Sequence, residues 1–467
     1  MYEHDVIVVG AGTAGLSLAI LLANEDINVA LVERKPKDLI GDKICGDAIA
    51  GHHYSATSGI PKPLGDALRL KVSGIKIYSP DMKHFITIIS SEGGYIIDRL
   101  KYGQQLLNTF IDKGGTLYDS VQAINLIIED GYARGIIARK LSSNELIKLK
   151  GKIIVDATGY QAQLLKKAPE RWRIEKHIDK RDLIIAYREI IHVRNPLWDV
   201  ENLHLHFIDR YAPGGYVWIF PWSKDGLYLN IGNGGMACYK TPHFRELLNN
   251  YASKVLPNLL ADRSIIKSGI WLIPNRRPRH VFVGDGFLAV GDSAIMINPA
   301  TSEGIGYGLY GAYLASKVII EALEEDDFSQ ESLWRYQHAY MTSPYGVRQA
   351  RLDVLRILMQ AHGDDDFQYV IKYKILSSGD LTKARNEDEF MSKLSKFIKA
   401  GRMILSRRIK LFKNMKYALD MMKVVRKLYE EYPNTPEGID DWIRREELIF
   451  NEVKDKLKPY NSYPVIC

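Results

Sequence analysis

From its sequence, the chain is expected to be an α/β protein with a parallel, nucleotide-binding sheet, a second, antiparallel sheet and a helical C-terminal region. Three observations lead to this expectation. A glycine-rich turn follows an apolar run near residue 10, aromatic residues alternate near residue 218, and cations surround an apolar stripe after residue 390. With 467 residues, 46% hydrophobic and 25% charged, the composition suits two or three globular domains and excludes a wholly disordered chain.

The N-terminal segment has the pattern of a Rossmann-type βαβ unit. The apolar run 5–9 is typical of a buried parallel strand, and a helical segment and a second apolar run follow it. Gly10 permits a tight turn, Gly12 lets the backbone approach a pyrophosphate, and Gly15 lets the helix pack closely on the strand. Glu33 lies 23 residues after Gly10, where a ribose-binding acid is expected. The segment therefore predicts a dinucleotide site, which also includes Thr13, Ala14 and Arg34.

Two later strands and a proline loop indicate which nucleotide binds. Residues 152–159 form an apolar run ending in Asp-Ala-Thr-Gly, residues 287–292 form one ending in Gly-Asp, and a loop through Asn298-Pro299 leads into a helical segment. This order resembles the flavoproteins of the p-hydroxybenzoate hydroxylase superfamily. The resemblance implies FAD as the cofactor and the following contacts to it: Asp292 at the ribityl chain, Gly304, Ile305 and Gly306 at the isoalloxazine ring, Arg99 at a helix start, and the backbone of Val121 at the adenine.

Further motifs narrow the resemblance. They are Lys43-Ile-Cys45-Gly46, the segment 76–81, and a Tyr-x-Trp-x-Phe-Pro segment at 216–221. Together they resemble the geranylgeranyl reductases, with archaeal members closest. The resemblance implies an enzyme that saturates C=C bonds of geranylgeranyl chains in archaeal ether lipids or their precursors, using a hydride from N5 of reduced flavin and a proton from a nearby acid.

The resemblance also implies that the segment Cys45-Gly46-Asp47 lies at the cofactor. Cys45 is the candidate proton donor, because an ordinary thiol is protonated at neutral pH. The alternative is that Cys45 is a small packing residue. The loop 298–303 departs from the family pattern, since it puts a carboxylate, Glu303, beside the expected flavin edge. No metal site is indicated.

Tyr216, Trp218 and Phe220 alternate along the chain, so they share one face of a strand. By itself such a stripe belongs to a hydrophobic core as readily as to a ligand site. Together with the family resemblance it predicts the wall of a long apolar tunnel over the flavin. Aromatic faces would stabilise positive charge that develops on the alkene.

Other functions remain open at this stage. One is a reductase acting on the prenyl tail of a quinone. Another is an FAD-dependent monooxygenase or halogenase, because halogenases carry a Trp-x-Trp-x-Ile-Pro segment that residues 216–221 partly match. A third is a lipid carrier or electron-transfer flavoprotein without catalysis. No second Rossmann unit is seen, so ferredoxin or transiently bound NAD(P)H is expected as the electron donor.

The strands that carry the nucleotide motifs must share one sheet, so the FAD-binding domain is expected to be discontinuous. It comprises residues 1–69, 94–169 and 281–330. Residues 70–93 and 170–280 form the substrate domain, and residues 331–467 form the helical region.

The segment 393–427 contains twelve lysines and arginines and one acidic residue, with apolar residues at helical spacing. It is interpreted as an amphipathic helix docked on the core, as a peripheral contact to an anionic membrane, or as both. No nucleic-acid-binding motif accompanies the charge, so nucleic acid is not an expected partner. The three cysteines, together with the lack of a signal peptide or a membrane-length apolar run, favour the cytoplasm.

Overall fold

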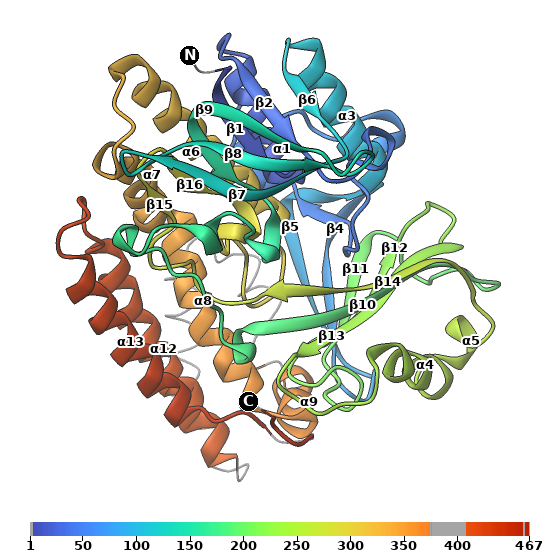
Figure 1. Ribbon diagram of the computed structural model, residues 1–467. Coiled ribbons are helices and arrows are strands. Elements are labelled where there is room, and N and C mark those ends of the chain that lie inside the picture. Colours follow the sequence, from blue (N-terminus) through green and yellow to red (C-terminus); the bar gives the residue numbers. More distant parts are fainter. Residues whose placement is uncertain (1–2, 374, 376–407, 461–462, 467) are drawn as a thin grey trace.

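The computed structural model describes residues 3–373, 375, 408–460 and 463–466, and it contains two mixed β-sheets (Figure 1). In the first sheet, β1 pairs in parallel with β2 on one side and with β9 on the other, as the N-terminal motif predicts. The strand order is β15 (Val283–Gly284), β16 (Phe287–Ala289), β9 (Leu146–Asp156), β1 (His4–Val9), β2 (Val29–Val32) and β6 (Thr116–Tyr118). The strands β7 (Val121–Glu129) and β8 (Tyr132–Lys140) join this sheet through β9 in antiparallel pairing.

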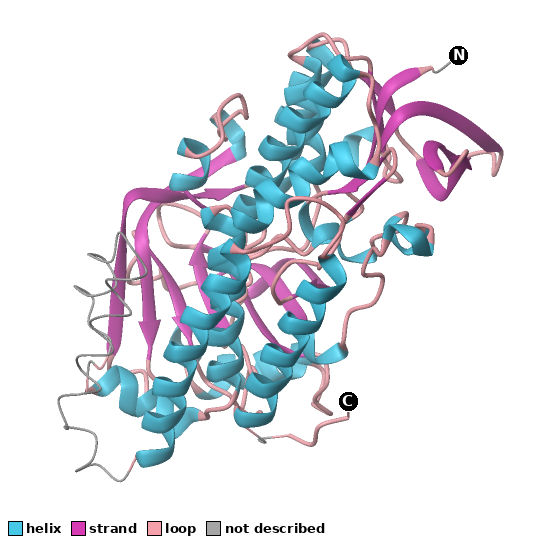
Figure 2. Cartoon of the chain, turned by 90° about the vertical axis from the view of Figure 1, so that its left-hand side faces the viewer, coloured by secondary structure: helices cyan, strands magenta, loops and turns pink. Residues whose placement is uncertain are grey.

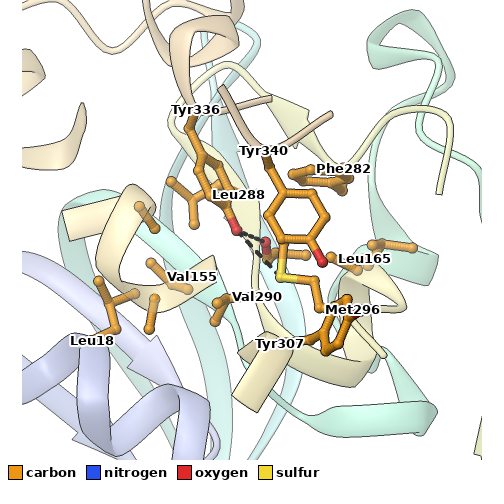
Figure 3. Packing of buried hydrophobic residues seen from close by; sticks show 14 of the residues in the cluster. Leu18, Val155, Leu165, Phe282, Leu288, Val290, Met296, Tyr307, Tyr336 and Tyr340 are labelled. Atoms are coloured by element: carbon orange, nitrogen blue, oxygen red, sulfur yellow. Dashed lines mark hydrogen bonds between the residues drawn. The ribbon is translucent and has the colours of Figure 1, made fainter. Parts of the chain in front are cut away.

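Helices pack on the first sheet and bury its apolar runs. The helix α1 (Thr13–Ala23) lies against α6 (Ile305–Glu325) and α3 (Arg99–Asp112). The helix α3 begins where the sequence predicts, because the Asp98 side chain accepts a hydrogen bond from the Lys101 backbone N–H at 3.1 Å. Figure 3 shows the packing of α7 (Gln330–Thr342) on this core, where the Tyr336 hydroxyl donates to the Ala289 carbonyl at 3.1 Å.

The second sheet contains the predicted aromatic strand near its centre. Its order is β14 (Ser264–Pro274), β10 (Leu183–His192), β13 (Tyr228–Met236), β12 (Tyr216–Pro221), β11 (Asn202–His206), β4 (Leu68–Tyr78), β5 (Phe85–Ile97) and β3 (Ala48–Ala50). The expectation of a purely antiparallel sheet is wrong at one place, since β11 and β4 run parallel. These two strands lie far apart in the sequence, so no hairpin fixes their relative direction. The helices α4 (Phe244–Lys254) and α5 (Pro257–Leu260) follow β13 in the chain.

The remaining helices form a layer beside both sheets (Figures 1 and 2). They are α8 (Pro344–Gln360), α9 (Asp364–Lys372), α12 (Ile409–Glu430) and α13 (Ile439–Lys456). The short helix α2 (His52–Ser55) is not part of this layer and contacts α6. A buried ion cluster ties this layer to the loop after β14. Arg277 donates to Glu446 of α13 at 2.9 Å and to Asp353 of α8 at 3.2 Å, and His280 lies 3.0 Å from Glu446.

The basic segment divides into two parts. Residues 393–407 lie outside the described residues, whereas the remainder belongs to α12, which packs along α8. The apolar face of α12 is buried and its lysines are exposed, as expected for an amphipathic helix docked on the core. Among the residues that the structure describes, no helix has the length and apolar character to cross a bilayer.

Candidate active site

The turn between β1 and α1 has the geometry that a bound pyrophosphate requires. Gly10 has φ +107°, and a side chain there would lie 2.4 Å from the Ala157 carbonyl oxygen, so only glycine fits. Gly15 lets α1 approach Gly10 itself, because a Cβ would lie 2.0 Å from the Gly10 carbonyl. At Gly12, no atom of the described residues beyond its chain neighbours lies within 4 Å of the Cβ position, so the start of α1 faces open space. A helix N-terminus that is open in this way attracts phosphate.

The end of β2 lies beside the start of β7. Glu33 and Arg34 follow β2, and Val121 is the first residue of β7. One Glu33 oxygen accepts a hydrogen bond from the Ala11 backbone N–H at 2.8 Å, and the Val121 N–H donates to the Glu33 carbonyl at 2.9 Å. Arg34 is exposed. The predicted ribose acid and the predicted adenine strand are therefore neighbours, beside the glycine turn.

The surroundings of Arg99 indicate whether the glycine-turn end of the site fits FAD. Its side chain is buried, yet its Nε and Nη1 have no hydrogen-bond partner in the part of the chain that the structure describes. A buried guanidinium without partners is unfavourable, and an anion beside it would relieve this cost. The bare N-terminus of α1, the Glu33 carboxylate and this guanidinium together suit the phosphates and ribose of FAD.

Asp292 and the first turn of α6 meet at the other predicted end of the cofactor. A Cβ at Gly304 would lie 3.1 Å from one Asp292 oxygen, and the second oxygen pairs with Lys43 at 3.1 Å. Lys43 belongs to the loop that carries Cys45, so three distant segments converge here. The structure brings together the residues predicted for the ribityl chain and the ring, although their contacts to FAD stay predictions.

A cavity of about 440 Å³ lies between the second sheet and α6. Tyr216, Trp218 and Phe220 line it from β12, and most of its wall is aliphatic or aromatic. Cys45, Gly46 and Asp47 also line it, together with Gly304 and Ile305. The predicted substrate stripe and the predicted flavin edge therefore face one space.

A buried polar network holds the Cys45 loop on the second sheet. The fully buried Asn230 of β13 donates to the Cys45 carbonyl at 3.0 Å and to Asp47 at 2.7 Å. It also accepts a hydrogen bond from the Trp218 indole N–H at 3.0 Å. Arg188 of β10 donates to the Lys43 carbonyl at 3.1 Å and approaches Asp47 to 4.0 Å.

Asp47 is the most perturbed group of this network. Burial raises the pKa of Asp47 to about 7, although Arg188, Arg99 and the hydrogen bond from Asn230 act in the opposite direction. Its second oxygen, Oδ1, has no hydrogen-bond partner among the described residues. Asp47 is buried yet lines the cavity, and its predicted role at the cofactor stays a prediction.

Glu303 lies where the sequence departs from the family pattern, and its carboxylate is fixed on both sides. One oxygen accepts from the Gly306 N–H at 3.0 Å, and the other lies 3.1 Å from His53 Nε2. Burial would raise the pKa of Glu303, but His53 and the Gly306 N–H outweigh burial and hold it below its usual range. The Tyr216 hydroxyl donates to the Thr301 carbonyl, and burial together with the nearby Cys45 and Glu303 raises the pKa of Tyr216.

The sequence interpretation missed Asn230, Arg188 and His53. A signal existed for the first two, because each is a polar residue in a strand with many apolar residues, and buried polar residues need partners. For His53 the sequence carries no comparable signal, since its partners lie about 250 and 292 positions away.

Two family models match segments of this chain, and known proteins match most of its length. The family model of the geranylgeranyl reductase catalytic domain matches residues 182–270, and that of an FAD binding domain matches residues 5–39. The digeranylgeranylglycerophospholipid reductase of Sulfolobus acidocaldarius is 34% identical over 458 residues, which cover 97% of this chain and 99% of that protein. The protein of the same name from Thermoplasma volcanium is 27% identical over 351 residues, 72% of this chain and 83% of that protein.

Solved structures show the same fold. A geranylgeranyl bacteriochlorophyll reductase-like protein from Thermoplasma acidophilum is 22% identical, with a TM-score of 0.75 over 89% of this chain and 99% of that chain. A myxobacterial chondrochloren halogenase is 18% identical, with a TM-score of 0.65 over 91% of this chain and 98% of that chain. These likenesses confirm the predicted flavoprotein fold and, at such identities, nothing finer. The relationship to the Sulfolobus protein spans nearly all of both chains, and it shows that this FAD-binding chain belongs to the digeranylgeranylglycerophospholipid reductase family.

Proposed function

We propose that this protein is an FAD-dependent reductase that saturates C=C bonds of geranylgeranyl chains in archaeal ether lipids or their precursors. The observation that carries the proposal is the cavity whose apolar wall faces both the Cys45 loop and the start of α6. A prenyl chain has no polar groups along its length, so an aliphatic and aromatic wall is the surface that it requires.

Reduced FAD supplies the hydride when it is bound. An isolated alkene has no carbonyl to hold negative charge, so a proton must be offered to one carbon as the hydride reaches the other. Cys45 lines the same cavity as Gly304 and Ile305, where its thiol would offer that proton. Asn230 holds the Cys45 carbonyl and thereby fixes the loop on the sheet.

The aromatic strand has two tasks in this mechanism. Tyr216, Trp218 and Phe220 are largely buried side chains that exclude water from the chain-binding space. Their ring faces would also stabilise a partial positive charge on the branched alkene carbon, by about 2 kcal/mol or more in a desolvated site. Trp218 is held in place by its hydrogen bond to Asn230.

We also propose the partners of this reaction. An iron–sulfur carrier such as ferredoxin, or transiently bound NAD(P)H, would supply electrons. The exposed cations of α12 would bring the protein to an anionic membrane surface, where its lipid substrates reside. They include Lys410, Lys413, Lys416, Lys423 and Lys427.

The proposed function is tested by anaerobic incubation of the FAD-loaded protein with dithionite and digeranylgeranylglycerophospholipid, followed by mass spectrometry. We expect the lipid to gain two hydrogens per reduced double bond. Cys45→Ala is expected to lose this activity, and Cys238→Ala is the matched control, because Cys238 is buried outside the described cavity wall. A lipid that leaves unchanged from wild-type protein would refute the proposal.

The same assay separates the alternatives. A monooxygenase or halogenase needs O₂, so it would leave the lipid unchanged under anaerobic conditions and modify an added substrate only in air. A quinone-tail reductase would saturate a prenylquinone in preference to the lipid in a competition between the two. A carrier would bind the lipid and release it unreduced.

A further inference from the structure

Alkene reduction in this cavity requires protons as well as electrons, and this inference rests on the proposed function. Saturating one C=C bond adds two hydrogens, which amounts to two electrons and two protons. When the reductant is a one-electron iron–sulfur carrier, it delivers electrons alone, so both protons come from solvent. An apolar wall excludes the water that would carry them. Side chains must therefore pass protons from the surface to the cavity.

A chain of three hydrogen-bonded groups leads out of the cavity. Glu303 lines the cavity, and its Oε2 lies 3.1 Å from Nε2 of His53. The other ring nitrogen of His53, Nδ1, lies 2.8 Å from the Tyr345 hydroxyl. His53 is buried, with a relative exposure of 1%, whereas Tyr345 is partly exposed and is not among the described residues of the cavity wall. The three groups thus span the distance between the cavity and the outside.

The surroundings of this chain are built to hold His53 in place. A Cβ at Gly306 would lie 2.1 Å from the His53 ring, so only glycine at this position lets the imidazole lie against the first turn of α6. The Gly306 N–H fixes the second Glu303 oxygen at 3.0 Å. The Tyr345 ring stacks on Tyr310 with a centroid separation of 4.0 Å and an interplanar angle of 9°. An imidazole held in this way accepts a proton at one nitrogen and releases one from the other.

The protonation states of His52 and Tyr345 favour proton transfer along the three hydrogen-bonded side chains. Burial and the adjacent His53 lower the pKa of His52 to about 4, so His52 stays neutral and does not compete for the proton. Burial raises the pKa of Tyr345, so its hydroxyl exchanges protons without ionising. Among the described residues, other titratable or charged groups near these three side chains are Tyr216, Cys45, Tyr307, Tyr310, Tyr340, Glu92 and Arg348.

We propose that Glu303, His53 and Tyr345 form a proton-uptake path that carries protons from solvent to the flavin edge of the cavity. Its inner end, Glu303, lines the same cavity as Cys45. The path would therefore reprotonate Cys45 after each reduced double bond. Glu303, His53 and Tyr345 are positioning residues in this scheme, because they act on the substrate through other groups.

The first experiment measures proton uptake without lipid. FAD-loaded protein is mixed anaerobically with reduced methyl viologen, an electron donor that carries no proton, in weakly buffered solution with a pH indicator. In the wild type, proton uptake is expected to keep pace with loss of flavin absorbance. In the Glu303→Gln and His53→Gln variants, the rate of proton uptake should be at least tenfold lower than in the wild type. Tyr313→Phe, which removes a partly exposed hydroxyl from α6, should match the wild type.

A second readout separates proton transfer from a purely structural role. His53→Ala should regain uptake in proportion to added imidazole, and Tyr345→Phe should slow uptake without loss of bound FAD. Wild-type uptake rates in both glutamine variants would overturn the proposal, and so would slow uptake that imidazole does not restore. The proton-uptake assay uses no lipid, so its outcome does not depend on lipid reduction. Failure of the wild type to saturate lipid in the separate lipid assay would refute the proposed function alone.

Discussion

Replacement of Asp47 by asparagine tests the electrostatics of the loop that carries Cys45. Asp47 is buried, its Oδ1 lacks a hydrogen-bond partner among the described residues, and the Arg188 guanidinium approaches it only to 4.0 Å. A carboxylate with so few hydrogen bonds is poorly stabilised in its charged form. Burial accordingly raises the pKa of Asp47 from 3.8 to about 7. An asparagine side chain at this position would keep an oxygen to accept the hydrogen bond from Asn230 but would never ionise.

The magnitude follows from linkage between protonation and folding. Below about pH 4, Asp47 is protonated in both the folded and the unfolded chain, so it adds no pH dependence. Between pH 4 and 7 the unfolded chain releases this proton and the folded chain retains it, so the folded state loses stability as the pH rises. At about 1.4 kcal/mol per pKa unit, the loss reaches about 4 kcal/mol above pH 7. The asparagine variant lacks this loss.

The assay is urea unfolding of FAD-free wild type and Asp47→Asn at pH 5, 6, 7 and 8, followed by tryptophan fluorescence. The stability of the variant relative to wild type should rise by about 1.4 kcal/mol per pH unit up to pH 7 and then level off. Other titrating groups occur in both proteins and cancel in this difference. A difference that is flat with pH would refute the reasoning, as would the absence at pH 6 of a protonated-carboxyl infrared band that the substitution removes.

Three further outcomes are expected. Cys45→Ala should retain FAD absorbance and lose at least about a hundredfold in lipid saturation, measured by mass spectrometry, and full activity would exclude the proton-donor role. Arg99→Met should weaken FAD binding by about 10- to 100-fold in a fluorescence titration, because a hydrogen bond to a charged group contributes about 1.5–3 kcal/mol, and an unchanged affinity would contradict the assignment. Glu446→Gln should destabilise the fold by about 3–5 kcal/mol, because it removes one of the two buried carboxylates that pair with Arg277. Arg277 and His280 outweigh burial and lower the pKa of Glu446. The greater stability of the wild type is therefore present above about pH 4 and is lost as the pH falls. Thermal unfolding midpoints of both proteins, measured as a function of pH, would show this.

The sequence predicted most of the fold because its signals are local. The glycine turn after β1 and the alternating aromatics of β12 each need only a few adjacent residues to be recognised. The parallel pairing of β11 with β4 escaped prediction, since it joins residues about 128 positions apart. Strand direction across such a distance depends on the packing of the whole sheet, which no short segment encodes.

The site was predicted in the same uneven way. Cys45 and Trp218 were identified through short motifs, but the link between them was not. That link is Asn230. Its side-chain amide donates hydrogen bonds to the Cys45 carbonyl and the Asp47 carboxylate, and it accepts one from the Trp218 indole. Its identity as a functional residue depends on three partners that lie 12 to 185 positions away.

This link also explains how one fold supports different chemistries. The halogenase and this chain share the flavoprotein fold, so the fold alone does not decide between oxygen chemistry and alkene reduction. In the proposed function, the deciding features are an apolar cavity wall and a proton donor at the flavin edge. Here Asn230 couples the two requirements, because it orients Trp218 in the apolar wall and holds the Cys45 loop with the same side chain. In the proposed mechanism, one amide therefore supports both the Cys45 proton donor, through Nδ2, and the water-excluding aromatic wall, through Oδ1.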